Sequence, residues 1–114
     1  MIEKTLLDYL NTNLDVPVYM ERPATPPAEY VLLEKTSGSI TNHICSSTIA
    51  VQSYAKTLYD AATLNEVVKA TTLCAYEVDE ISSVNLNSDY NFTNTADKQY
   101  RYQAVFVITH YEDY

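Results

Sequence analysis

The residues best suited to nucleophilic chemistry in this chain of 114 residues are two cysteines and two histidines. His43 and Cys45 stand two positions apart, so on a strand both side chains point to one side, as a thiol–imidazole pair requires. Cys45 also alternates with Ile49 and Val51 in the period of a buried strand face, where an inert core thiol is the usual occupant. We therefore predict that the protein is not an enzyme, with a small enzyme using His43 or Cys45 as the alternative.

The sequence lacks the residues that a cofactor site or a metal site needs. A Walker loop or a dinucleotide-binding loop requires several glycines to bring backbone amides to phosphate, and the chain has one, Gly38. Cys45 and Cys74 do not have the spacing of a zinc site, and two histidines are too few to complete one with them. We expect no cofactor and no metal.

Acidic residues outnumber basic ones, 15 to 7, for a net charge of −8. Adjacent acids such as Asp79 and Glu80 point to opposite faces of a strand, which is a poor arrangement for acid–base catalysis. The basic residues are scattered along the sequence and form no cluster, so tight nucleic-acid binding is not expected. The acidity indicates either simple solubility or a surface past which DNA slides without adhering.

The elements that position these residues begin with a short amphipathic helix, predicted over residues 2–13 and followed by Pro17. Beyond it we expect an edge strand at 16–21 and a stiff proline-rich connector at 22–29, since proline fixes its own φ and constrains the residue before it. Alternation of apolar and polar residues then predicts a strand at 30–36.

The single glycine marks the expected turn of a hairpin. Ser37-Gly38-Ser39 predicts a turn in which Gly38 takes a positive φ, followed by a return strand at about 42–53. Helical spacing takes over at Tyr54. One buried helical stripe is expected from Tyr54, Leu58, Ala61, Leu64 and Val68.

Two more strands follow this second helix. Alternation predicts a half-buried strand at 82–92, with Leu86 and Tyr90 on the same face. Residues 100–111 return after a turn. The stretch 104–108 is apolar on both faces, which is typical of a central strand.

The order of elements predicts one domain over residues 1–114, because no repeat or low-complexity segment divides the chain. We expect the α+β class: a mainly antiparallel sheet with two helices packed on one face and an extended β-hairpin arm. A free sheet edge is an aggregation liability unless it is paired.

Tyrosine, with 11 copies, is the most abundant aromatic residue. If 82–92 and 100–111 pair as a hairpin, Tyr90, Tyr100 and Tyr102 lie near one another. Tyrosine suits surfaces that are half dry and half wet, so we predict an interface there, with ordinary cross-strand packing as the alternative.

The segment from Leu6 to Ala70 resembles the small tail terminator, or head-to-tail joining, proteins of long-tailed bacteriophages and prophages. The resemblance rests on the strand at 18–19, the proline-rich connector, "YVLLEKTSGS", and the "TIAVQSYA" strand that leads into an alanine-containing helix. After Cys74 only the strand–turn–strand layout matches.

This resemblance implies a virion structural protein made in the bacterial host cytoplasm: a ring, usually of six copies, that caps the tail tube and joins it to the head. The implied partners are copies of itself, the major tail tube protein and a head-completion or connector protein. DNA crosses the pore without tight binding, and no membrane is involved. Asp79, Glu80 and Asp89 are then candidate pore-lining acids, since like charge keeps DNA from adhering. The alternatives are another phage neck or head-completion ring component and a small non-viral intracellular adaptor.

Overall fold

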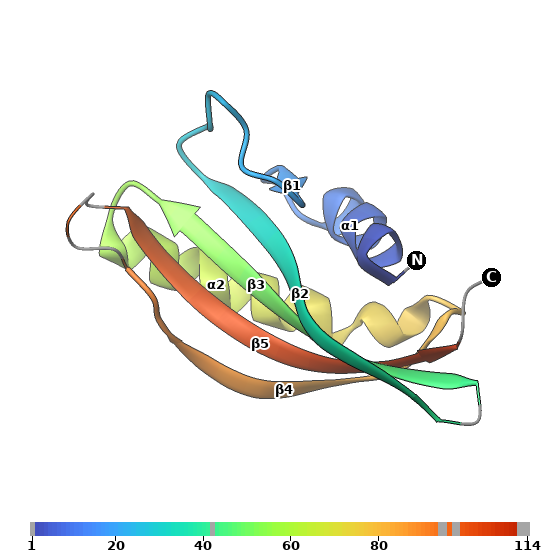
Figure 1. The fold of residues 1–114 in the computed structure, drawn as a ribbon. Coiled ribbons are helices and arrows are strands. Elements are labelled where there is room, and N and C mark those ends of the chain that lie inside the picture. The colour runs from blue at the N-terminus through green and yellow to red at the C-terminus, as the bar shows by residue number, and fades with distance from the viewer. Residues whose placement is uncertain (1, 42, 94–95, 97–98, 112–114) are drawn as a thin grey trace.

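The computed structural model describes residues 2–41, 43–93, 96 and 99–111. Both α-helices lie on one face of its sheet, and the long strands run along the long axis of the molecule (Figure 1). The elements follow one another as α1 (Ile2–Asn13), β1 (Val18–Tyr19), β2 (Tyr30–Thr41), β3 (Ile44–Ala55), α2 (Leu58–Leu73), the short 3₁₀ helix η1 (Ala75–Glu77), β4 (Ile81–Asn91) and β5 (Tyr100–Tyr111).

The five strands form one sheet in the order β1-β2-β3-β5-β4. Every neighbouring pair is antiparallel except β1 and β2, which are parallel. The apolar strand β5 therefore lies between β3 and β4, which confirms the predicted central strand. The α+β class with a mainly antiparallel sheet is confirmed as well.

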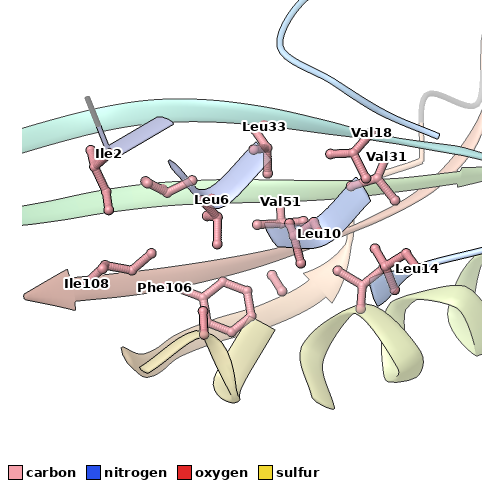
Figure 2. Packing of buried hydrophobic residues seen from close by; sticks show 14 of the residues in the cluster. Ile2, Leu6, Leu10, Leu14, Val18, Val31, Leu33, Val51, Phe106 and Ile108 are labelled. Atoms are coloured by element: carbon pink, nitrogen blue, oxygen red, sulfur yellow. The ribbon is translucent and has the colours of Figure 1, made fainter. Parts of the chain in front are cut away.

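One face of the sheet carries the hydrophobic core. Alternate residues of β2, β3 and β5 point to the helices, and α1 contributes a stripe of residues spaced three or four apart (Figure 2). Fully burying each large aliphatic side chain is worth about 1.5–3 kcal/mol. The core is built from Ile2, Leu6, Leu10, Val31, Leu33, Ile49, Val51, Leu64, Val68, Phe106 and Ile108.

The β2–β3 hairpin turns later than the sequence predicted. Gly38 pairs with Ser47 inside the hairpin and has no positive φ, whereas His43, with φ of 66°, supplies the left-handed residue. Pairing continues to Thr41 and Ile44 because hydroxyl side chains are tolerated on an exposed ribbon. A Cβ at Gly38 would lie 3.0 Å from Cε of Lys35, a flexible and exposed side chain that can move aside, so the structure does not require glycine there. The predicted start of the return strand, Asn42, lies outside the described residues.

The second helix also begins later than predicted. Tyr54 belongs to β3, where it pairs with Tyr30 and Arg101. α2 begins after Thr57, whose side chain accepts a hydrogen bond from the backbone N–H of Asp60 at 3.0 Å, as an N-cap residue does. The predicted stripe is correct from Ala61 onward, but Leu58 is exposed, and the buried positions are Ala61, Leu64, Asn65, Val68 and Thr72.

A bulge in β4 breaks the predicted alternation. Leu86 pairs with Phe106 and Ser88 with Val105, so Asn87 has no partner in the register. Leu86 consequently lies on the helix side of the sheet and Tyr90 on the opposite side. The prediction that the two share a face is wrong.

The hairpin that stands clear of the helices is β2–β3 (Figure 1). All residues from Glu34 to Thr41 are exposed, and the apolar side chains near the turn are 61% (Ile40) and 47% (Ile44) exposed. We call residues 34–41 and 44–47 the arm. The 82–111 hairpin, in contrast, is integrated into the sheet through β5.

Within the described residues, no helix is both long and apolar enough to cross a membrane.

Candidate functional site

The sheet face without helices carries a row of aromatic rings, to which β1, β2, β3 and the end of β4 contribute. The rings of Tyr30 and Tyr54 are stacked, with centroids 4.5 Å apart and planes 5° apart, and Tyr19 meets Tyr30 edge-on at 6.2 Å. Tyr90 and Phe92 make a second edge-on pair at 5.9 Å. Such pairs add about 0.5–1.5 kcal/mol each beyond their buried area.

Arg101 joins the two aromatic groups. Its guanidinium carbon lies 5.6 Å from the centroid of the Tyr54 ring and 4.5 Å from that of Phe92, both within cation–π range. Its Nη1 donates to the Tyr54 hydroxyl at 2.8 Å and its Nε to the Phe92 carbonyl oxygen at 2.7 Å. We call Tyr19, Tyr30, Tyr54, Arg101, Phe92 and Tyr90 the aromatic row.

A directed chain of hydrogen bonds runs beside this row. The Tyr54 hydroxyl donates to Gln52 Oε1, Gln52 Nε2 donates to Gln103 Oε1, and Gln103 Nε2 donates to the Tyr90 hydroxyl. The side chains of Tyr54, Gln52 and Gln103 are buried although no helix covers them. These four side chains therefore have hydrogen-bond partners, and the series of bonds stiffens this face of the sheet.

Beside Tyr30 and Tyr54 of the aromatic row, residues of the proline-rich connector and of the ends of three strands line an open surface hollow of about 430 Å³. We call it the connector hollow. Its lining includes Arg22 and Pro26 from the connector, Tyr30 from β2, Lys56 after β3 and Tyr100 at the start of β5. Gln99 ties the connector to β5: in the amide orientation that satisfies both groups, its Oε1 accepts from Arg22 Nη1 at 2.9 Å.

The connector hollow brings basic residues together that the sequence scatters. Arg22 and Lys56 line it, and Arg101 lies behind its Tyr54 wall, so three of the seven basic residues gather at one end of the sheet. Burial raises the pKa of the Tyr30 hydroxyl, while Arg22 and Arg101 act to lower it. The expectation that the basic residues form no cluster is wrong, because strand pairing joins positions that are far apart in sequence.

A second hollow, of about 480 Å³, lies on the helix side of the arm. Ser47 Oγ and His110 Nε2 are 2.7 Å apart on its wall, and His110 Nδ1 is 3.2 Å from the Tyr111 carbonyl oxygen. Burial lowers the pKa of His110 below 6.5, and the hydrogen bond to Tyr111 opposes this shift. His110 is therefore a neutral imidazole that bonds two strands together.

The structure places the residues of the alternative enzymatic prediction in different surroundings. Cys45 is buried and pairs with His110, whereas His43 lies in the hairpin turn. Ser47 is 1% exposed, and β3 has a hydrogen-bonded strand on each side, so its amides are not available as oxyanion donors. Among the described residues, no group of three or more His, Cys, Asp or Glu side chains is placed to hold a metal ion.

The three tyrosines predicted at an interface do not form a single patch. Tyr90 pairs with Gln103 on the face without helices and is 41% exposed. Tyr102 pairs with Ser53, on the other side of the sheet, and Tyr100 is at the end of the sheet in the connector hollow. The sequence missed Tyr30, Tyr54 and Arg101, which the strand register alone reveals as the middle of the aromatic row.

The three candidate pore-lining acids have different environments. Asp79 and Glu80 are exposed in the turn that precedes β4. Asp89 instead accepts hydrogen bonds from Asn65 Nδ2 at 2.6 Å and from Lys69 Nζ, and these bonds anchor β4 to α2. Its charge is compensated within the subunit.

Comparison with known proteins finds no protein-family model and no curated sequence that matches this chain.

Proposed function

We propose that this chain is a structural protein of a long-tailed bacteriophage virion, a tail terminator. In this proposal copies form a ring that caps the tail tube, joins it to the head connector and leaves a pore for DNA. The resemblance of residues 6–70 to that family supports the proposal. So does the α+β fold with a projecting hairpin, whose elements the same segment largely supplies.

The observation that carries the proposal is that the sheet has an open edge on each side, and that these two margins differ in sequence. On one side the arm exposes the outer edge of β2, because β1 pairs only with Val31 and Leu32. On the other side β4 offers an edge of 11 residues without proline or lysine, interrupted by the bulge at Asn87. Its one charged residue, Asp89, is held by α2. Monomeric proteins usually protect such edges, so open edges favour an oligomer.

Two different margins suit a closed ring better than a two-fold dimer. A ring is built from heterologous contacts, in which each subunit uses one surface toward one neighbour and another surface toward the next. The exposed Ile40 and Ile44 give the arm an apolar end for such a contact. We propose no reaction, because surface complementarity and a passage for DNA are the whole task.

Binding to purified phage assemblies tests the proposal. Labelled protein is mixed with tail tubes that lack a terminator, or with DNA-filled heads, and the bound position is imaged by electron microscopy. We expect label at one end of the tubes. Label on heads alone would identify a neck or head-completion component instead, and label on neither assembly would favour the non-viral adaptor.

A further inference from the structure

The two ends of the sheet carry opposite charge. At one end the connector hollow presents Arg22 and Lys56, with Arg101 behind them. At the other end Glu77, the last residue of η1, and Asp79 and Glu80 in the turn that follows it are all exposed. We call residues 77–80 the acidic turn. In a chain of net charge −8, a basic hollow is a local exception that calls for an anionic partner.

Strand β5 fixes the separation of these two surfaces. Tyr100, its first residue, lines the connector hollow, while the backbone N–H of Tyr111, its last, donates to the Glu80 carbonyl oxygen at 3.1 Å. The eleven steps between its 12 residues, at about 3.3 Å each, span about 36 Å. The molecule is 44 Å long, so the surfaces occupy opposite ends of its long axis and cannot meet within one copy.

Both surfaces have charges that are not neutralised inside the subunit. The ion pairs between described residues involve Lys4 with Asp8, and Lys69 with Glu66 and Asp89. Within the part of the chain that the structure describes, Arg22 and Lys56 have no acidic partner, and the three acids of the turn have no basic one. Gln99 Oε1 accepts from both Nη1 and Nη2 of Arg22, so an incoming carboxylate would pair with the remaining N–H donors of the guanidinium, which has five.

We propose that the connector hollow of one copy receives the acidic turn of a neighbouring copy of this chain. The inference rests on the proposed ring and names the contact that closes it: basic end to acidic end, repeated around the circle. The contact is heterologous, as a ring requires. Tyr30 and Tyr100 give the hollow an aromatic wall, which lowers the local dielectric and strengthens a carboxylate–guanidinium pair.

This contact and the pore-lining role predicted for Asp79 and Glu80 make different demands on the same side chains. A pore-lining acid faces DNA, so its reversal hinders genome passage and leaves the ring intact. An acid in the proposed contact faces a neighbouring subunit, so its reversal prevents association. Charge reversal therefore separates the two roles.

The test uses two double variants of the full chain and their mixture. The hollow variant carries Arg22→Glu and Lys56→Glu, and the turn variant carries Asp79→Lys and Glu80→Lys. Sedimentation velocity at low salt measures self-association. We expect wild type to associate, and each variant alone to associate at least about tenfold more weakly, because like charges now meet. An equal mixture should recover association, since each contact again joins opposite charges.

Two control variants each place one reversal elsewhere on the surface: Lys4→Glu, which also breaks the exposed ion pair with Asp8, and Asp15→Lys. They should associate like wild type, and circular dichroism should show that all variants are folded. Added salt should weaken wild-type association, a measurement that needs no variant. A wild type that stays monomeric at low salt, variants that associate normally, or a mixture that fails to recover would each overturn the proposal.

Tail-tube binding by the same samples separates this inference from the proposed function. Tube binding by wild type, with self-association indifferent to both reversals, overturns the inference and leaves the tail terminator proposal standing. Self-association that follows the charge pattern, without any binding to tubes, overturns the tail terminator proposal and leaves the inference standing. Loss of tube binding in the hollow variant with unchanged self-association would assign the hollow to a tail protein and overturn the proposal.

Discussion

At the scale of single residues, the protonation of His110 makes the stability of the fold depend on pH. Its neutral ring bonds Ser47 on the neighbouring strand, and burial, with a smaller contribution from Lys35, lowers its pKa below 6.5, while Glu3 acts in the opposite direction. The unfolded chain therefore binds this proton more readily than the folded chain does. The stability that the neutral His110 ring gives to the folded protein is complete above pH 6.5 and is lost as the pH falls below it.

We predict that the free energy of unfolding decreases between about pH 7.5 and 5.5, a range above most carboxylate titrations. His110→Gln, which removes the titration and keeps a hydrogen-bonding group, should flatten this decrease. Urea unfolding at the two pH values measures both slopes. Equal slopes in wild type and variant would contradict the role given to His110.

Asp89 is a second residue with a definite structural task. Its carboxylate holds Lys69 and Asn65 of α2, and the side chains of Lys69 and Asp89 are 16% and 27% exposed. Asp89→Asn should cost about 1–2 kcal/mol in the free energy of unfolding, as a charge-assisted bond is lost. The control is Glu66→Gln, which also removes an ion pair with Lys69. Because Glu66 is 71% exposed, that change should cost at most about 0.5 kcal/mol.

Urea unfolding at neutral pH measures this pair of variants. Equal and small effects would show that Asp89 is a solvated charge, which would return it to the set of acids available to a pore.

At the scale of elements, the N-terminus of α2 depends on one side chain. Thr57 caps the helix through the Asp60 N–H, and Thr57→Ala should destabilise the protein by about 1 kcal/mol. Thr63→Ala is the matched control within the same helix, because its hydroxyl only donates back to the Tyr59 carbonyl oxygen at 2.9 Å. It should be neutral or slightly stabilising, since alanine is the better helix former. Thermal unfolding that ranks the two variants in the reverse order would contradict the assigned cap.

Local patterns in the sequence predicted most elements, α1 and β5 with their observed bounds, but misplaced the β2–β3 turn and the start of α2. The apolar alternation of Cys45, Ile49 and Val51 identified β3 and its buried face, since one side of that strand meets the helices. The turn was misplaced because Ser37-Gly38-Ser39 has the composition of a turn but lies where the ribbon still pairs. Tyr54 matched the helical period, yet its stacking on Tyr30 holds it in the sheet.

At the scale of the whole molecule, the sequence could indicate the layers but not the assembled surfaces. Arg22, Lys56 and Arg101 are separated by long stretches of chain and meet only because the connector crosses the ends of β3 and β5. The aromatic row has the same origin: its members come from different strands, and the bulge at Asn87 decides that Tyr90 joins them. Such sites depend on register, which composition and spacing do not specify.

The open margins and the opposite charges at the two ends give one subunit everything that a repeating head-to-tail contact needs. The free protein is therefore expected to associate with copies of itself, and contact with a tail tube should select the closed form by binding it more tightly. Ring closure at the tube end is the central claim, because the proposed function depends on it.

The most direct measurement is electron microscopy of the purified protein mixed with terminator-free tail tubes, with end-on averages of the tube tips. The account predicts a closed ring with cyclic symmetry and an open centre at one end of each tube. Bare tube tips at protein concentrations that saturate self-association, or an open filament in place of a ring, would contradict it.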